Sequence, residues 1–221
     1  MHQYVIQGSS QRLPIGKIIG LARTYKAHAE EMHAAVTEDP LLFLKPESAV
    51  IFSGGSIIIP SRSHCLHHEV ELGVVIGTDG AFISEARARY HILGYLVALD
   101  ITARDIQDEA KKKGWPWAIA KGFDTFAPIS DVVPAERIPD PMNLDLTLHI
   151  NGQLRQQANT SLLLYSLDRI VSFISEIMTL RTGDLIMTGT PQGVGEIKEG
   201  DLLEARLEDY CSLRVDVRNK T

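Results

Sequence analysis

The sequence predicts one α+β domain that is mainly β. Many short apolar runs are bounded by Gly and Pro, and the few helical periodicities lie among them without regular strand–helix alternation. The chain has 221 residues and no repeat, low-complexity tract or linker that would divide it. Apolar residues make up 44% and charged residues 23% of the chain, which is typical of a globular protein that buries its own core.

The expected strands are short β-branched or apolar runs. In chain order they span residues 17–21, 41–44, 57–59, 70–76, 95–99, 145–150, 185–187, 202–207 and 213–217. Asn151-Gly152 separates the run at 145–150 from another that starts at Leu154. This dipeptide favours the type I′ turn of a β-hairpin.

One long helix and two short ones are expected between the strands. Apolar residues recur at steps of three and four residues at Leu164, Leu167, Val171, Ile174 and Met178. This spacing predicts an amphipathic helix between residues 161 and 180, with Thr160 or Ser161 as its N-cap. The segments 24–35 and 103–113 predict two shorter, polar helices.

Charge and cysteine usage exclude several classes of protein. Lys and Arg total 22 against 28 Asp and Glu, a formal charge of −6, so a nucleic-acid partner is not expected. The short basic run at 111–113 is interpreted as a solvated helix face. Cys65 and Cys211 form no metal or redox spacing and favour a reducing compartment. No signal peptide or run of roughly 20 apolar residues is recognised, which predicts a cytoplasmic protein with no membrane partner.

Two carboxylates two residues apart are the first candidates for a site. On a strand, Glu69 and Glu71 project from the same face. A solvated strand is the ordinary alternative, but the apolar run at 72–76 predicts a strand that is covered on both faces. Two buried carboxylates side by side require a cation. Asp100 ends the apolar run at 95–99, either as a third ligand or as the N-cap of the helix that follows.

These carboxylates favour a hard divalent cation. Oxygen ligands select Mg²⁺, Mn²⁺ or Ca²⁺. His64, His67 and His68 leave zinc as a weaker alternative, because adjacent histidines on a strand point to opposite faces. Three anionic ligands leave coordination positions for water or substrate, which is typical of a catalytic site.

Two further segments contain residues that could act in catalysis or in binding a small anion. In Tyr25-x-x-His28-x-x-Glu31 a helix would place Glu31 beside His28 and orient it as a general base, although a polar helix surface is the alternative. The glycine-rich segment 188–195 lacks the signatures of nucleotide-binding loops. Its N–H groups and the Thr190 hydroxyl are expected either to face a small anion or to form a plain turn. Considered alone, Lys121 would be interpreted as a surface lysine.

Taken together, these segments resemble the fumarylacetoacetate hydrolase family, especially its short single-domain acylpyruvate hydrolase and oxaloacetate decarboxylase members. The resemblance is carried by YxxHxxE at 25–31, FLKP at 43–46, HExELG at 68–73, DITARDIQ at 100–107, AKGFDT at 120–125 and GDLIxTGTPxGVG at 183–195. It runs from about residue 17 to the C-terminus and implies a catalytic domain at 17–221 after an N-terminal strand or extension at 1–16. One departure is Ala22-Arg23-Thr24-Tyr25, where the family often has Gly-x-Asn-Tyr.

The resemblance implies a mixed β-roll and a homodimer. It implies Mg²⁺ or Mn²⁺ held by Glu69, Glu71 and Asp100, with His28 and Glu31 as catalytic residues on a lid and Lys121 as a further catalytic residue. Arg23, Gln107 and Thr190 are implied to bind the substrate.

The implied reaction is cleavage of a carbon–carbon bond in a small 2-oxo acid through a metal-bound pyruvate enolate, by acylpyruvate hydrolysis, oxaloacetate decarboxylation or both. One alternative is a 5-carboxymethyl-2-oxo-hex-3-ene-1,6-dioate decarboxylase/isomerase of aromatic catabolism, and another is an oxaloacetate enol–keto tautomerase. A metal-stabilised dimerisation module without catalysis is the non-enzymatic alternative.

Overall fold

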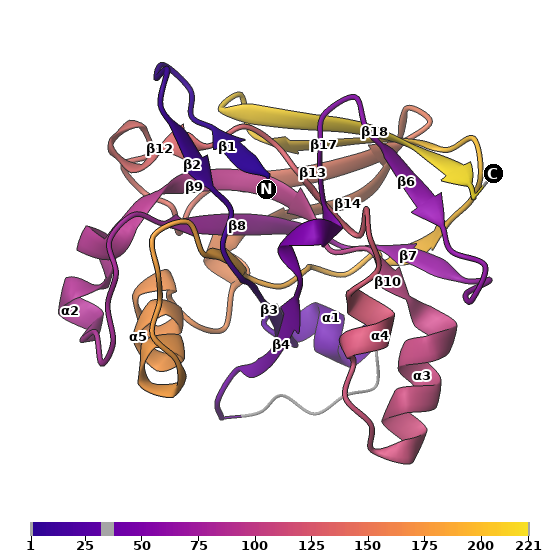
Figure 1. Ribbon diagram of the computed structural model, residues 1–221, viewed down its shortest axis with the longest axis horizontal. Helices are drawn as coiled ribbons and strands as arrows, with labels where there is room; N and C mark the ends of the chain where they lie inside the picture. The colour runs from indigo at the N-terminus through magenta and orange to yellow at the C-terminus, as the bar shows by residue number, and fades with distance from the viewer. Residues whose placement is uncertain (1, 32–37, 221) are drawn as a thin grey trace.

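A computed structural model describes residues 2–31 and 38–220 and confirms a mainly β, α+β fold. Two large sheets make up most of it (Figure 1). The larger sheet is mixed, and its order is β4 (Leu41–Lys45), β3 (Ile18–Ala22), β15 (Leu185–Met187), β8 (Val70–Ile76), β9 (Ile92–Leu99), β11 (Ala127–Ile129) and β5 (Val50–Phe52), with β12 (Val133–Pro134) also on β9. The second sheet has the order β14 (Gln153–Asn159), β13 (Asp145–Ile150), β17 (Leu202–Leu207), β18 (Cys211–Asn219) and β6 (Ser56–Ile59).

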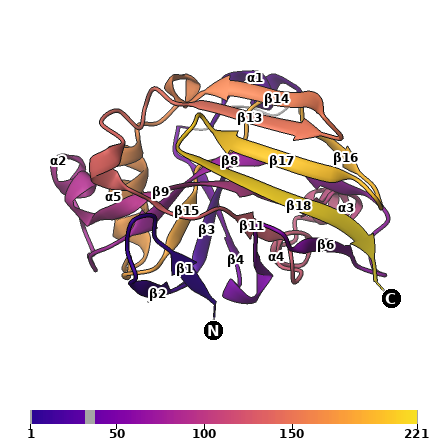
Figure 2. The ribbon, with the colours of Figure 1, turned by 90° about the horizontal axis from the view of Figure 1, so that it is seen from above.

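Two small sheets complete the strands. One pairs β1 (Gln3–Val5) with β2 (Arg12–Pro14), and the other has the order β10 (Thr102–Ala103), β7 (Leu66–His68) and β16 (Gly195–Ile197). Single turns of 3₁₀ helix lie at η1 (Glu47–Ala49), η2 (Arg89–His91), η3 (Ala135–Arg137) and η4 (Thr160–Leu162). Figure 2 shows the five-stranded sheet lying across β8 and β9.

The central strands β8 and β9 are buried on both faces, as the apolar run predicts. Alternate residues face two separate apolar clusters: Leu72 and Val97 pack in the core shared with the five-stranded sheet, whereas Val75 and Leu96 pack in a smaller core on the other face. Because side chains alternate along a strand, Glu71 projects from the Val75 side of β8. A carboxylate is therefore placed inside the molecule by the strand itself.

The long helix is shorter than the periodicity predicts. α5 spans Leu167–Ile177, and Ser166 is its N-cap, with the Ser166 hydroxyl accepting from the Arg169 N–H at 3.1 Å. The prediction of a start at 161 with Thr160 or Ser161 as the cap is wrong. The Thr160 hydroxyl accepts from the Leu144 N–H and donates to the Pro141 carbonyl, so tertiary contacts use the group that a cap requires.

The other local predictions are confirmed in part. Asn151 and Gly152 both adopt positive φ, 52° and 77°, as the type I′ turn between β13 and β14 requires. α3 spans Arg104–Lys113 and ends at Gly114, whose φ of 67° is left-handed. α1 spans Lys26–Glu31, and positions 32–35 of the predicted helix lie outside the described residues.

The sequence pattern does not predict the short helices α2 (Glu85–Ala88) and α4 (Ala118–Lys121). In the described part of the chain, no helix has the length and apolar character needed to cross a membrane.

Candidate active site

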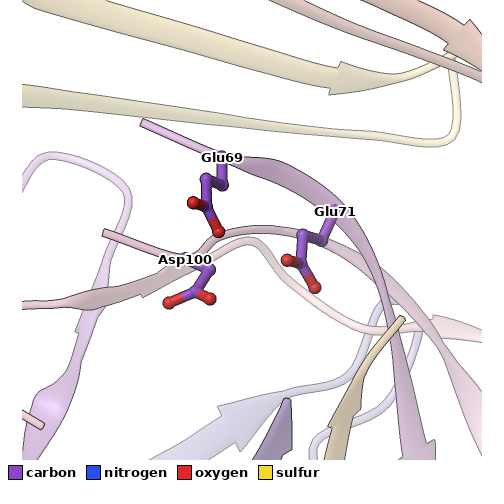
Figure 3. Close-up of side chains that lie close together, drawn as sticks. All are labelled: Glu69, Glu71 and Asp100. Carbon is purple, nitrogen blue, oxygen red and sulfur yellow. The ribbon is translucent and has the colours of Figure 1, made fainter. Parts of the chain in front are cut away.

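Three buried carboxylates meet at the ends of the two central strands. Glu69, Glu71 and Asp100 each offer an oxygen atom, and the three atoms lie within 4.8 Å of one another (Figure 3). Their exposed fractions are 6%, 1% and 0%. The β8–β9 register pairs Val70 with Leu99, so the residues just outside this pair, Glu69 and Asp100, also lie opposite each other. The Asp100 N–H donates to the Glu69 carbonyl at 2.8 Å.

Two details of the cluster differ from the sequence interpretation. Glu69 lies in the break between β7 and β8 rather than on a strand, although its carboxylate still joins that of Glu71. Asp100 is not a helix N-cap, because α3 begins at Arg104 and Ala103 occupies the cap position. The Asp100 carboxylate instead contacts two buried lysines. Of the two roles predicted for Asp100, membership of the carboxylate cluster fits the structure and the N-cap does not.

Three cations hold the cluster. The Lys121 ammonium donates to Glu69 Oε2 at 2.9 Å, to the Thr102 hydroxyl at 2.7 Å and to Asp100. Lys45 Nζ donates to Asp100 Oδ1 at 2.5 Å, and the Arg104 guanidinium donates to Glu69. Lys121 is 2% exposed, so its interpretation as a surface lysine is wrong.

The charges balance formally, but the three carboxylates are not equivalent. Burial opposes ionisation of Glu69, yet Lys121 and Arg104 hold its pKa well below the usual range. Burial, together with the charges of Asp100 and Glu69, raises the pKa of Glu71 well above its usual range. The Glu71 carboxylate accepts from the Gly189 N–H at 2.7 Å, but no ion pair joins it to a side chain in the described part of the chain.

The site fits a divalent cation. Its donors are all carboxylate oxygens, which Mg²⁺ and Mn²⁺ prefer, and Glu71 lacks a cationic partner among the described residues. The Tyr25 hydroxyl is buried without a hydrogen-bond partner, and the Glu71 charge contributes to raising the pKa of Tyr25. A buried polar atom without a partner is one that a bound ion or its water could satisfy.

The histidines that precede Glu69 do not support zinc. His68 Nδ1 lies 2.9 Å from Gln156 Oε1, and His67 Nδ1 accepts from Arg104 Nε at 3.3 Å. The candidate metal cluster found in the described residues contains no histidine.

The cluster opens into a cavity of about 310 Å³. The cavity is lined by Glu69, Glu71 and every predicted catalytic and substrate-binding residue except Glu31. Asp100 is fully buried and does not line the cavity. The lining residues are Leu21, Ala22, Arg23, His28, Phe43, Glu69, Glu71, Arg104, Gln107, Lys111, Trp117, Lys121 and Thr190. Arg23 adopts φ of 62°, a conformation that is costly for a side chain with a Cβ. The residue expected to contact substrate is thus held in a strained backbone conformation at the cavity.

His28 and Glu31 form a pair on α1. His28 Nδ1 lies 3.3 Å from Glu31 Oε2, and His28 is 9% exposed and lines the cavity. The Gly193 N–H donates to the Glu31 carboxylate at 3.1 Å and 3.2 Å. A purely solvated helix face is therefore excluded for His28.

The glycine-rich segment 188–195 donates backbone hydrogen bonds to carboxylates of the protein itself. Gly189 donates to Glu71 and Gly193 donates to Glu31, so the anions that these two N–H groups contact belong to the site itself. The Thr190 hydroxyl donates to the Val70 carbonyl at 2.9 Å. We find neither a plain turn nor, at these two N–H groups, a site for a free anion.

Sequence reasoning did not assign roles to Lys45, Arg104 and Gln156. Nothing in their local patterns distinguishes the first two from surface cations. Gln156 could have been recognised as an inward-facing residue, because side chains two residues apart on a strand share a face and Gln156 shares the buried face of β14 with Ala158. Its oxygen accepts from the Val70 N–H, and its amide nitrogen donates to the Thr190 hydroxyl at 2.9 Å and to Pro191.

We expect Gln156→Met to lower the free energy of unfolding by about 3 kcal/mol, because several buried polar groups would lose their partner at once. Urea unfolding measures this. Gln157→Met, an exposed neighbour on the same strand, is the matched control and should change stability by less than about 0.5 kcal/mol. Equal losses in the two variants would show that the bonds of Gln156 do not hold the site together.

The fold and the site define a class of protein: a mixed β-roll that carries a buried cluster of three carboxylates, a candidate cation site, beside a histidine–glutamate pair. The chain belongs to the family described as Fumarylacetoacetate (FAA) hydrolase C-terminal, which it matches over residues 17–218.

Curated relatives and solved structures agree with this assignment. The chain is 48% identical over 200 residues to oxaloacetate tautomerase FAHD1, mitochondrial, of Rattus norvegicus, covering 90% of each chain. It is 35% identical to a fumarylpyruvate hydrolase of Pseudomonas aeruginosa in complex with Mn²⁺ and pyruvate, with a TM-score of 0.95 and coverage of 99% and 96%. It is 41% identical to a 5-carboxymethyl-2-hydroxymuconate delta-isomerase of Mycobacterium smegmatis, with a TM-score of 0.84 and coverage of 95% and 81%.

Proposed function

We propose that this chain is a divalent-metal-dependent enzyme that acts on small 2-oxo acids, with oxaloacetate and acylpyruvates as its candidate substrates. The observation that carries the proposal is the joint placement of the acidic cluster and His28 on one cavity. The named activities of the relatives, oxaloacetate tautomerase and fumarylpyruvate hydrolase, support the substrate class. The Mn²⁺ in the second of these supports a cation of the Mg²⁺ or Mn²⁺ type.

The residues fit distinct roles. Glu69, Glu71 and Asp100 would hold the cation, which when bound supplies Lewis-acid stabilisation of negative charge on substrate oxygens. The Lys121 ammonium lies at the cluster and supplies a fixed positive charge against the same developing charge. Gln107 accepts from Arg104 at 2.6 Å through its oxygen, which leaves its amide N–H groups to orient a substrate carboxylate.

His28 is the residue that moves a proton. Because its Nδ1 faces Glu31, its Nε2 is left to exchange a proton within the cavity. In hydrolysis it would deprotonate the water that attacks the distal carbonyl of an acylpyruvate. In tautomerisation it would take a proton from the carbon between the 2-oxo group and the distal carboxylate of oxaloacetate and return it to the 2-oxo oxygen, which gives the enol. Loss of CO₂ from oxaloacetate needs no water, so that reaction depends less on His28.

The relatives give specific support to tautomerisation as a second candidate activity, because the oxaloacetate tautomerase is 48% identical to this chain. The decarboxylase/isomerase alternative has a structural neighbour in the delta-isomerase. A non-catalytic dimerisation module explains neither the cavity nor the His28–Glu31 pair. A homodimer and a cytoplasmic location stay predictions; sedimentation analysis checks the first and fractionation of cells the second.

A substrate panel with metal add-back tests the proposal. Acetylpyruvate, enol and keto oxaloacetate, and an unsaturated oxo-diacid are each assayed with EDTA-treated protein, before and after Mg²⁺ or Mn²⁺ is restored. We expect turnover of at least one 2-oxo acid only after add-back. Full activity of the stripped protein, or no turnover of any of these compounds, would contradict the proposal.

His28→Asn should separate the candidate reactions. We expect acylpyruvate cleavage to fall by about 10²- to 10⁴-fold, the usual contribution of a general base, and oxaloacetate decarboxylation to fall much less. Initial rates on both substrates measure this, and His64→Asn, an exposed histidine outside the cavity, is the control. An equal loss on both substrates would rule out this division of roles.

A further inference from the structure

Two lysines flank an aromatic wall in the cavity, which we define as the rings of Phe43 and Trp117. The ring centroids lie 6.1 Å apart. Lys121 Nζ lies 4.7 Å from the centroid of Phe43, and Lys111 Nζ lies 5.7 Å from that of Trp117. All four residues line the cavity. The wall therefore has a cation at each end.

The position of the wall is built into the fold. Phe43 on β4 pairs with Gly20 on β3, and a Cβ at Gly20 would lie 2.2 Å from the Phe43 ring. The ring occupies the space that this glycine leaves. Trp117 directly precedes α4, the helix that carries Lys121 at its end. The wall and the lysine at the acidic cluster are thus held by adjacent elements.

Lys111 differs from Arg104 and Lys121, which also line the cavity, because its ion pair is with Asp108 and not with a carboxylate of the acidic cluster. Residues 104, 107 and 111 follow at steps of three and four and lie on one face of α3. Arg104 bonds Glu69, whereas Lys111 lies seven residues further along, about 10 Å at the rise of an α-helix. The interpretation of the run 111–113 as a solvated face is therefore incomplete, since Lys111 lines the cavity.

The ion pair between Lys111 and Asp108 is weak. Asp108 Oδ1 lies 3.6 Å from Lys111 Nζ, and the two side chains are 34% and 51% exposed. Ion pairs this open to solvent contribute little, so a ligand carboxylate can replace Asp108. Burial and the neighbouring Arg104 charge lower the pKa of Lys111, as expected for an ammonium that faces a cavity already holding other cations. An incoming anion would relieve that repulsion.

We propose that Lys111 and the face of Trp117 form a subsite for a second carboxylate, at the end of the substrate remote from the acidic cluster. This inference rests on the proposed function and narrows its substrate class to 2-oxo diacids. The 2-oxo acid group faces the acidic cluster and Lys121, the carbon chain lies along the aromatic wall, and the distal carboxylate accepts from Lys111. The subsite selects by charge, because a methyl group there would leave Lys111 without its anion.

Two compounds of equal length test the subsite without turnover. 2-Oxoglutarate and 2-oxopentanoate differ only in carrying a carboxylate or a methyl group at the far end, and neither has the second carbonyl that cleavage requires. Calorimetric titration of the Mn²⁺-loaded protein should show that 2-oxoglutarate binds at least about tenfold more tightly. Lys111→Met should remove this difference, Lys111→Arg should retain most of it, and Lys112→Met, the next residue on the helix, should leave it unchanged.

Kinetics with the same variants separate this inference from the proposed function. With Lys111→Met, kcat/KM for fumarylpyruvate, an unsaturated 2-oxo diacid long enough to lie along the aromatic wall, should fall about tenfold through KM, while that for acetylpyruvate changes less than about twofold. Equal losses on the two substrates, or an unchanged preference for 2-oxoglutarate in the titration, would overturn the subsite. If the subsite is overturned in this way, turnover of acetylpyruvate by the wild-type protein and by Lys111→Met would still support the proposed function. If no compound of the substrate panel is turned over, the proposed function fails, and the titration alone decides whether the diacid subsite exists.

Discussion

Asp100→Asn is expected to abolish divalent-cation binding and to lower turnover by at least about 10³-fold, because loss of a ligand removes several kcal/mol of charge stabilisation. Asparagine keeps the size of the side chain and one acceptor oxygen, which can serve Lys45, while Lys121 keeps its bonds to Glu69 and Thr102. The variant should therefore fold, which Asp100→Ala would not guarantee, because the buried Lys45 ammonium would lose the carboxylate it pairs with while Lys121 would keep only Glu69. Calorimetric titration with Mn²⁺ and the substrate panel measure the two losses.

Asp184→Asn is the matched control for the loss of a buried carboxylate. Asp184 is 2% exposed, accepts from the Arg181 N–H at 2.7 Å and pairs with Lys17, outside the cavity. Its replacement should cost stability and leave Mn²⁺ binding intact. Tight Mn²⁺ binding by Asp100→Asn, or equal loss of binding in both variants, would show that the three carboxylates are not the cation site.

Lys121→Met is expected to affect catalysis and cation binding in opposite directions. Turnover should fall by about 10²- to 10³-fold because a preorganised positive charge is removed from the reacting end of the cavity. Divalent-cation affinity should rise by at least about tenfold, since two unit charges about 4 Å apart interact by roughly 4 kcal/mol near a protein surface. In this structure the Lys121 ammonium contacts two of the three carboxylates, so it competes with an incoming cation.

The same variant should be less stable without metal, by about 3 kcal/mol, because Glu69 and Asp100 lose a buried counter-charge. Mn²⁺ should restore that stability. Thermal unfolding with and without the cation measures the effect, and Lys17→Met, which removes a lysine paired outside the site, is the control. Weaker Mn²⁺ binding by Lys121→Met would mean that Lys121 assists the cation rather than competing with it.

Local patterns predicted the features that depend on neighbouring residues. The apolar run of β8 predicted a strand buried on both faces, and Asn151-Gly152 predicted its turn because positive φ at both positions requires such residues. The joint order of six motifs indicated the family. The start of α5 was predicted wrongly, because Thr160 bonds to residues far from the helix, which the spacing of leucines does not report.

The sequence by itself indicated the family, the fold class and the pair Glu69 and Glu71, since two carboxylates two residues apart beside a buried apolar run require a cation, and the family resemblance added Asp100. Only the tertiary structure decided how their charge is balanced. Lys45, Arg104 and Lys121 come from three different elements. Apart from the family motifs that contain them, nothing near them in the chain distinguishes them from surface cations. The physical reason is that the partner of a buried charge is chosen by proximity in space: strand register brings Glu69 and Asp100 together, and the fold carries the matching cations to them.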